Sequence, residues 1–282
     1  MYTTLISVHE LTTQLAGPAG PLLIVDCRFD LADPAAGQRA YDAGHLPQAI
    51  YAHLDLHLSS PITPDSGRHP LPSPERFAAI LGAWGLTPQT QVIAYDTDNG
   101  AFAARLWWLL RWAGHDAVAV LDGGFKAWKA SGGTVSTEIP HPLPTTVAFV
   151  PRAELTLTAK EVADRVQRAD WRLLDARAPE RFAGKVEPID RVGGHVPGAR
   201  NHPFASNLGA DAKFLSPDEL RARLERSQDG VDDRQTIAMC GSGVTACHLL
   251  LALEHAGKHG ARLYPGSWSE WIRDPQRPVA KD

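Results

Sequence analysis

The stretch TIAMCGSGVTACHLLLALEHAG, residues 236–257, joins a short apolar run to a helical pattern through a loop that holds a cysteine. The first part is apolar without alternation, which is typical of a strand buried on both faces. The second part has a helical apolar period and stops at Gly257. Cys240 is therefore predicted at a strand-to-helix turn, where open α/β sheets place their binding sites.

A second copy of this pattern occurs earlier in the chain. QVIAYDTDNGAFAARLWWLL, residues 91–110, matches the stretch above but has Asp96 at the position of Cys240. Further matched pairs, each 143 to 150 residues apart, are Asp26 and Asp175, His45 and His195, and Trp128 and Trp271. What both copies keep is expected to serve the fold, whereas what only one copy has indicates function.

Apolar runs and helical segments alternate in both copies. Strands are predicted for LLIVD (22–26), QVIAYD (91–96), AVAVLD (117–122), RLLDA (172–176), TIAMC (236–240) and ARLY (261–264). Helices are predicted for residues 73–86, 216–227 and 244–257, the first two with a serine cap before a proline. This order predicts an α/β fold in which each half is a mostly parallel sheet with helices on both faces.

The length of 282 residues fits two domains of roughly 100–200 residues each. We expect one domain at residues 1–138 and the other at residues 155–282. Residues 139–154 hold four prolines, which favour extended backbone, and are expected to form a linker. Because the two domains supply their own interface, we expect a monomer.

Composition excludes several classes of function. A formal charge of -4 gives no basic surface for nucleic acid or an anionic membrane. No apolar run reaches the roughly 18 residues of a membrane-spanning helix, and the first residues lack a signal-peptide pattern. We expect a cytoplasmic protein. The three cysteines do not make a disulfide framework, and no two cysteines have the close spacing of a zinc site.

The loop after Cys240 is suited to hold an anion. Gly241 and Gly243 allow backbone conformations that turn N–H groups inward, and a helix begins directly afterwards. Both features favour thiolate over thiol, and Ser242 and Thr245 add hydroxyl donors. The alternative is that Cys240 is an ordinary buried small residue. Asp96 in the first copy argues against that alternative, because an apolar slot does not readily accept an aspartate.

CGSGVTAC (240–247), HVPGA (195–199), DAR (175–177) and the duplication resemble the two-domain rhodanese-like sulfurtransferases, over about residues 5–275. The resemblance implies an inactive first domain, a catalytic second domain, and neither metal nor organic cofactor. It also implies a ping-pong reaction. Cys240 takes a sulfane sulfur from a donor, becomes a persulfide, and passes the sulfur to cyanide or a thiol.

The resemblance also implies a donor. Gly-Ser-Gly after the cysteine is typical of members that prefer 3-mercaptopyruvate, whereas a basic pair is typical of those that prefer thiosulfate. We therefore favour 3-mercaptopyruvate, with a thiosulfate:cyanide sulfurtransferase as the alternative. The expected substrate-binding residues are Arg181, Arg191, Gly241, Gly243, Val244 and Thr245. Neither arginine has a counterpart in the first copy.

In this family a serine, a histidine and an acid form a relay. The resemblance assigns Ser242 and His69, with Asp55 as the acid and Asp65 as the alternative acid. His69 as a plain loop histidine stays open, and Arg68 beside it is a second candidate for binding the substrate anion. The implied partners are small-molecule donors and acceptors, together with a thioredoxin-like reductant.

Other residues are expected to be structural. His45 and His195 are duplicated, as are the Asp26–Arg28 and Asp175–Arg177 pairs, while Cys27 and Cys247 are expected only to pack. Two rival functions fit the sequence less well. A cysteine phosphatase is excluded because the sixth position after Cys240 is Ala246, where an arginine must hold the phosphoryl group. A docking module without activity is disfavoured because the second copy keeps a complete cysteine loop.

Overall fold

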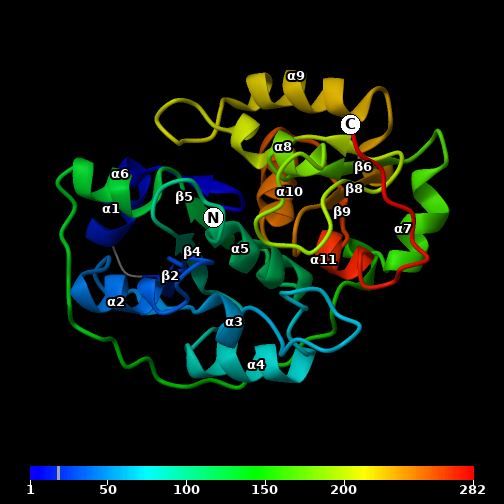
Figure 1. The fold of residues 1–282 in the computed structure, drawn as a ribbon. Coiled ribbons are helices and arrows are strands. Elements are labelled where there is room, and N and C mark those ends of the chain that lie inside the picture. The colour runs from blue at the N-terminus through cyan, green and yellow to red at the C-terminus, as the bar shows by residue number, and fades with distance from the viewer. Residues whose placement is uncertain (18–19) are drawn as a thin grey trace. The chain divides into compact units, whose positions relative to one another are not determined.

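The computed structural model describes residues 1–17 and 20–282, and these divide into two compact units. The first unit consists of Met1–Ser60, Pro72–Arg152 and Ala210–Phe214. The second consists of Pro61–Leu71, Ala153–Gly209 and Leu215–Asp282. Within the described residues each unit has one sheet, of five and four strands, in which every strand pair is parallel (Figure 1). The predicted α/β fold with a parallel sheet in each half is confirmed.

The sheet of the first unit has the strand order β1-β5-β4-β2-β3. Its strands are β1 (Leu5–Ile6), β2 (Leu22–Asp26), β3 (Ile50–Tyr51), β4 (Gln91–Tyr95) and β5 (Val118–Leu121). The helices of this unit are α1 (Val8–Ala16), α2 (Ala36–Ala43), α3 (Leu54–His57), α4 (Pro74–Ala83), α5 (Ala103–Trp112) and α6 (Gly124–Ala130). Leu11 of α1 and Phe125 and Trp128 of α6 share a buried cluster with Ile93 and Tyr95 of β4. The helix α5 contacts β4 and β5.

The sheet of the second unit has the order β7-β6-β8-β9. Its strands are β6 (Arg172–Asp175), β7 (Arg200–Asn201), β8 (Thr236–Met239) and β9 (Arg262–Leu263). The α-helices are α7 (Ala159–Val166), α8 (Pro179–Phe182), α9 (Pro217–Gln228), α10 (Thr245–His255) and α11 (Ser267–Trp271). Three short 3₁₀ turns are η1 (Ala153–Leu155), η2 (Phe204–Asn207) and η3 (Asp233–Gln235). The helices α9 and α10 contact each other, and both contact the sheet (Figure 1). The helix α7 also contacts the sheet, and α11 contacts α7.

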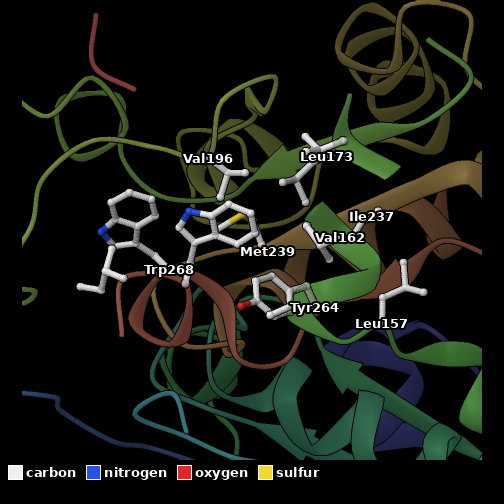
Figure 2. Close-up of a cluster of buried hydrophobic side chains, with 12 residues drawn as sticks. Leu157, Val162, Leu173, Val196, Ile237, Met239, Tyr264 and Trp268 are labelled. Carbon is white, nitrogen blue, oxygen red and sulfur yellow. The ribbon is translucent and has the colours of Figure 1, made fainter. Parts of the chain in front are cut away.

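The core of the second unit holds α11 against the sheet. Figure 2 shows the indole ring of Trp268 beside the side chain of Met239, the last residue of β8. Val196 and Tyr264 belong to the same buried cluster, and all four side chains are fully buried. Since Cys240 follows Met239 directly, this cluster fixes the backbone that leads into the cysteine loop.

The duplicated Asp–Arg pairs close the ends of equivalent strands with the same geometry. Arg28 Nη2 donates to Asp26 Oδ2 at 2.6 Å, and Arg177 Nη2 donates to Asp175 Oδ2 at 2.6 Å. Each guanidinium also donates to a glycine carbonyl at 2.7 Å, that of Gly44 or of Gly194. All four charged side chains are buried. Their hydrogen bonds fix the loop after each strand, which is the structural role expected of features that both copies keep.

The duplicated histidines also bind backbone. His45 Nδ1 and Nε2 lie 2.8 and 2.9 Å from the carbonyl oxygens of Tyr41 and Glu138. His195 Nδ1 lies 2.9 Å from the carbonyl oxygen of Phe182, whose ring stacks on the imidazole. Both histidines are buried, and their contacts with backbone carbonyl oxygens hold the turns in which they lie.

The proline-rich stretch between the copies has no helix or ladder from residue 137 to residue 152. Thr145 donates its N–H to Gly82 O at 2.9 Å and its hydroxyl to Leu86 O at 2.7 Å, so the stretch lies along α4 in the first unit. Within the described part of the chain, no helix combines the length and apolar character needed to cross a membrane.

Candidate active site around Cys240

Cys240 lies in the loop between β8 and α10 and is 2% exposed. The Gly243 N–H donates to Cys240 Sγ at 3.2 Å. Gly243 has φ +79°, and a Cβ there would lie 2.3 Å from the carbonyl oxygen of Pro265. Only glycine fits this position, and its conformation aims one main-chain donor at the sulfur. Val244 caps α10 without a side-chain hydrogen bond and Thr245 is its first residue, so the positive end of the helix begins beside the loop.

The start of α11 fixes the backbone of the cysteine. The N–H of Trp268 donates to Cys240 O at 3.0 Å, and the N–H of Ser269 donates to Gly241 O at 2.9 Å. Ser267 Oγ accepts the N–H of Cys240 at 3.1 Å and donates to Tyr264 O at 2.9 Å. Both backbone polar groups of Cys240 are therefore held by α11. Ser267 was not identified from the sequence. The one signal that could have found it is that the first copy has a glycine, Gly124, at the matched position.

Ser242 and His69 meet in the second unit. Ser242 Oγ lies 2.7 Å from His69 Nδ1, and each residue is 6% exposed. His69 belongs to the segment Pro61–Leu71, which is part of the second unit although it lies in the first half of the sequence. The structure thus brings together a hydroxyl two residues after the cysteine and an imidazole that can exchange a proton with it.

The two candidate acids lie in different units. Asp55 is half-buried in α3 of the first unit, where its N–H donates to His53 Nδ1 at 3.1 Å. Asp65 is exposed in the segment that also holds His69. The acid partner of His69 remains a prediction.

Two guanidinium groups lie against the residue after the cysteine. A Cβ on Gly241 would lie 3.0 Å from Arg68 Nη2 and 3.5 Å from Arg181 Nη2. A side chain at this position would require the end of the Arg68 side chain to shift. Two guanidinium groups from residues distant in the chain therefore lie beside a loop whose own sequence has no cation. Arg191 makes a different contact, donating from Nη2 to Ile272 O after α11 at 2.5 Å.

Two buried acids bind these arginines. Glu187 accepts from Arg181 Nε at 3.1 Å and from Nη2 at 2.8 Å. Asp190 bridges the arginines, with Oδ2 3.2 Å from Arg181 Nη2 and Oδ1 bonded to Arg68 Nη1. Burial raises the pKa of Asp190 although both arginines oppose the shift. Burial also works to raise the pKa of Glu187, but the bond from Arg181 and the N–H of Asp190 leave that pKa lowered. Neither acid was anticipated from the sequence.

In the first unit an aspartate fills the equivalent loop. The carboxylate of Asp96 accepts the N–H groups of Gly100, Phe102 and Ala103 at 2.9, 2.9 and 3.2 Å. Burial raises the pKa of Asp96 even though these three bonds favour its charged form. The main-chain donors of this turn are aimed at an acceptor that the chain itself supplies, at the place where the second unit has a sulfur.

The other cysteines make structural contacts. Cys27 is 1% exposed, and burial together with Asp26 raises the pKa of its thiol. Cys247 is fully buried in α10 and donates to Gly243 O at 3.3 Å. Within the described residues, no cluster of three or more His, Cys, Asp or Glu is placed to hold a metal ion.

Comparison with known proteins agrees with the duplication. The family model for the rhodanese-like domain matches twice, at residues 7–131 and 158–274. A Pseudomonas aeruginosa protein named "Probable 3-mercaptopyruvate sulfurtransferase" is 47% identical over 278 residues, covering 98% of this chain and 97% of its own. The thiosulfate sulfurtransferase of Cricetulus griseus is 35% identical over 282 residues, covering 96% and 93%. The solved 3-mercaptopyruvate sulfurtransferase of Leishmania major matches with a TM-score of 0.83 at 32% identity, over 97% of this chain and 76% of that one.

Proposed function

Because the chain belongs to the rhodanese-like family, as a sulfurtransferase with two copies of the domain, we propose that Cys240 carries sulfur from 3-mercaptopyruvate to cyanide or a thiol. The second unit is the catalytic one. In the first, Asp96 replaces the cysteine and occupies its own loop. In the sequence, the two copies of the domain are proposed to span residues 1–138 and 155–282, with residues 139–154 as the linker between them.

In the first step the Cys240 thiolate attacks the thiol sulfur of 3-mercaptopyruvate. An S–S bond forms while the C–S bond of the donor breaks. The electron pair of the broken bond passes to the methylene carbon as the enolate of pyruvate, and the proton of the thiol ends on that carbon. The products are pyruvate and the Cys240 persulfide anion, with atoms and charge balanced. The ketone of the donor makes this possible, since it stabilises the enolate.

In the second step the acceptor attacks the outer sulfur. Cyanide forms a C–S bond as the S–S bond breaks, which releases thiocyanate and regenerates the Cys240 thiolate. A thiolate acceptor leaves instead as a persulfide. In the cell we propose a thiol acceptor and a thioredoxin-like reductant for a monomeric, cytoplasmic enzyme.

The contact between Ser242 and His69 carries this proposal. Their 2.7 Å hydrogen bond lies two residues from Cys240 in a buried site, where a hydroxyl and an imidazole can take the thiol proton and return it to the enolate. The acid proposed for the relay with His69 is Asp55, with Asp65 as the alternative. The Gly243 N–H, already 3.2 Å from Cys240 Sγ, favours negative charge on the sulfur, as do Gly241, Val244 and Thr245 around the helix start.

Arg181 binds the donor carboxylate and Arg191 its ketone. The guanidinium of Arg181 next to Gly241 supports the first assignment. For the second, Arg191 must leave its bond to Ile272 O when the donor binds.

Thiosulfate is the alternative donor, with the same cysteine. The observation that favours it is the pair of guanidinium groups beside Gly241, because cations suit a compact dianion. The 47% identity to the P. aeruginosa protein and the Gly-Ser-Gly loop support 3-mercaptopyruvate.

The test measures thiocyanate formation from cyanide with each donor in turn. We expect a higher kcat/KM for 3-mercaptopyruvate, together with pyruvate release in equal amount. A higher kcat/KM for thiosulfate would show that thiosulfate, and not 3-mercaptopyruvate, is the preferred donor. No thiocyanate with either donor would defeat the proposal as a whole.

A further inference from the structure

The charges beside the cysteine loop cancel. Arg68 and Arg181 bring two positive charges to Gly241, while Glu187 and Asp190 bring two negative charges to the same guanidinium groups. The acid side chains are 6% and 5% exposed, and those of Arg68 and Arg181 are 23% and 18% exposed. The arginines therefore face the solvent side of a cluster whose acids lie behind them.

Asp190 is the acid that links both arginines. Its Oδ1 binds Arg68 and its Oδ2 binds Arg181, so one carboxylate contacts both guanidinium groups and offsets part of their positive charge. Glu187 has a different set of bonds. It accepts the N–H groups of Ile189 and Asp190 at 3.1 Å each and lies 3.5 Å from Arg177 Nη1. Glu187 thus holds Arg181 and the local backbone, whereas Asp190 is the one of these two acids that contacts both loop-facing arginines.

Donor charge makes this arrangement selective. Thiosulfate carries two negative charges on a small ion, whereas 3-mercaptopyruvate with a neutral thiol carries one. In a partly buried site, each additional unit charge of the ligand interacts with the net charge of the protein groups around it. Compensated arginines still offer directed N–H groups to one carboxylate, but they give little long-range attraction for a dianion.

From this geometry we infer that Asp190 is a specificity-determining residue, which disfavours dianionic sulfur donors by neutralising Arg68 and Arg181 beside the cysteine loop. The inference rests on the proposed function and deepens it, because it names the group that determines which donor charge the site prefers. Removing the carboxylate leaves the two arginines and Glu187, with a net charge of +1. The dianion then gains more than the monoanion.

Asp190→Asn tests this directly, because it removes the charge and keeps the size. We expect the ratio of kcat/KM for thiosulfate to kcat/KM for 3-mercaptopyruvate to rise about fivefold at low ionic strength. The rise should shrink as salt is added, because part of the site faces solvent. Asp190→Glu should keep the wild-type ratio, since it retains the charge.

The matched control is Asp218→Asn, which makes the same charge change at an acid whose side chain is 91% exposed on α9. It should leave the ratio unchanged. Should Asp190→Asn not fold, as judged by circular dichroism, Asp190→Ser offers a smaller neutral residue for the same measurement. An unchanged or lower ratio in a folded neutral variant overturns the inference while the proposed function stands. Wild-type protein without turnover on either donor would defeat the proposed function itself.

Discussion

Ser267 and Gly124 have the same left-handed backbone conformation at equivalent positions, with φ values of +53° and +55°. Each lies four residues before a matched tryptophan, Trp271 or Trp128. At Gly124 a Cβ would lie 2.6 Å from Asp96 O, so glycine is required there. The second unit keeps a serine in a conformation that is unfavourable for it, and the serine hydroxyl accepts the N–H of Cys240.

Two variants separate the two properties of Ser267. Ser267→Ala removes the hydroxyl and keeps the strained φ, whereas Ser267→Gly removes both. We expect both variants to lower kcat roughly tenfold, since the backbone of Cys240 loses the same hydrogen bond. The alanine variant should also be less stable than the glycine variant, by about 1 kcal/mol. Steady-state kinetics and urea unfolding of each variant check this, and wild-type kcat in Ser267→Ala would refute the positioning role.

Cysteine substitutions should affect turnover very unequally. Cys240→Ser removes the sulfur that carries the product and should abolish thiocyanate formation with either donor. Cys27→Ser and Cys247→Ser should keep kcat within about twofold of wild type, because burial raises the pKa of the Cys27 thiol and the Cys247 thiol donates to Gly243 O. After addition of donor alone, mass spectrometry should find that the peptide containing Cys240 has gained about 32 Da, the mass of one sulfur atom. Equal loss of activity in Cys27→Ser would contradict the assignment.

The sequence predicted the strands β2, β4, β5, β6 and β8 and the helices α4, α9 and α10, for physical reasons, whereas α1, α2 and α7 were not predicted. Runs such as residues 91–95 and 236–239 are apolar on both faces, and the cap before α4 is local chemistry. The strands β1, β3 and β7 were not predicted, because each has only two residues and forms by pairing with a strand distant in the sequence. β9 is equally short and was predicted only through the match of ARLY to AVAVLD in the first copy.

The site was predictable only in part, because its contacts join distant segments. The loop glycines mark Cys240 from the local sequence alone. The contact of Ser242 with His69 spans 173 residues, and only family resemblance proposed it. Asp190 was missed because nothing in its local sequence shows that it binds Arg68, 122 residues away.

Asp96 should matter for stability and not for catalysis. Its carboxylate accepts three buried N–H groups, which Asp96→Ala leaves without that acceptor. We expect a loss of roughly 2–4 kcal/mol in the free energy of unfolding of the first unit, with kcat of the folded enzyme unchanged. Thermal unfolding measures the loss of stability, and steady-state kinetics at temperatures below the unfolding transition measure kcat. Unchanged stability would mean that water replaces the carboxylate, and a lower kcat in folded protein would give this loop a catalytic role.

His202 should make the second unit less stable in mild acid. Its Nδ1 lies 2.7 Å from Ser227 Oγ and its Nε2 lies 2.8 Å from Asn207 Oδ1, and burial lowers the pKa of the imidazole from its ordinary 6.5. As the pH falls through about 6.5, His202 of the unfolded chain therefore binds a proton, whereas His202 of the folded chain stays neutral. The stabilisation is present above that pH and is lost as the pH falls toward the lower, folded-state pKa.

His202→Gln keeps hydrogen-bonding groups at this position and cannot take up a proton. Between pH 6.5 and 5, the wild-type free energy of unfolding should fall more steeply than that of the variant, by up to about 1.4 kcal/mol per pH unit. Urea unfolding at pH 8, 6.5, 5.8 and 5 measures both slopes. Burial also lowers the pKa of His57, His115 and His255, so the wild-type slope contains their contributions and the difference between the two proteins isolates His202. Parallel curves would show that His202 does not resist protonation in the folded protein.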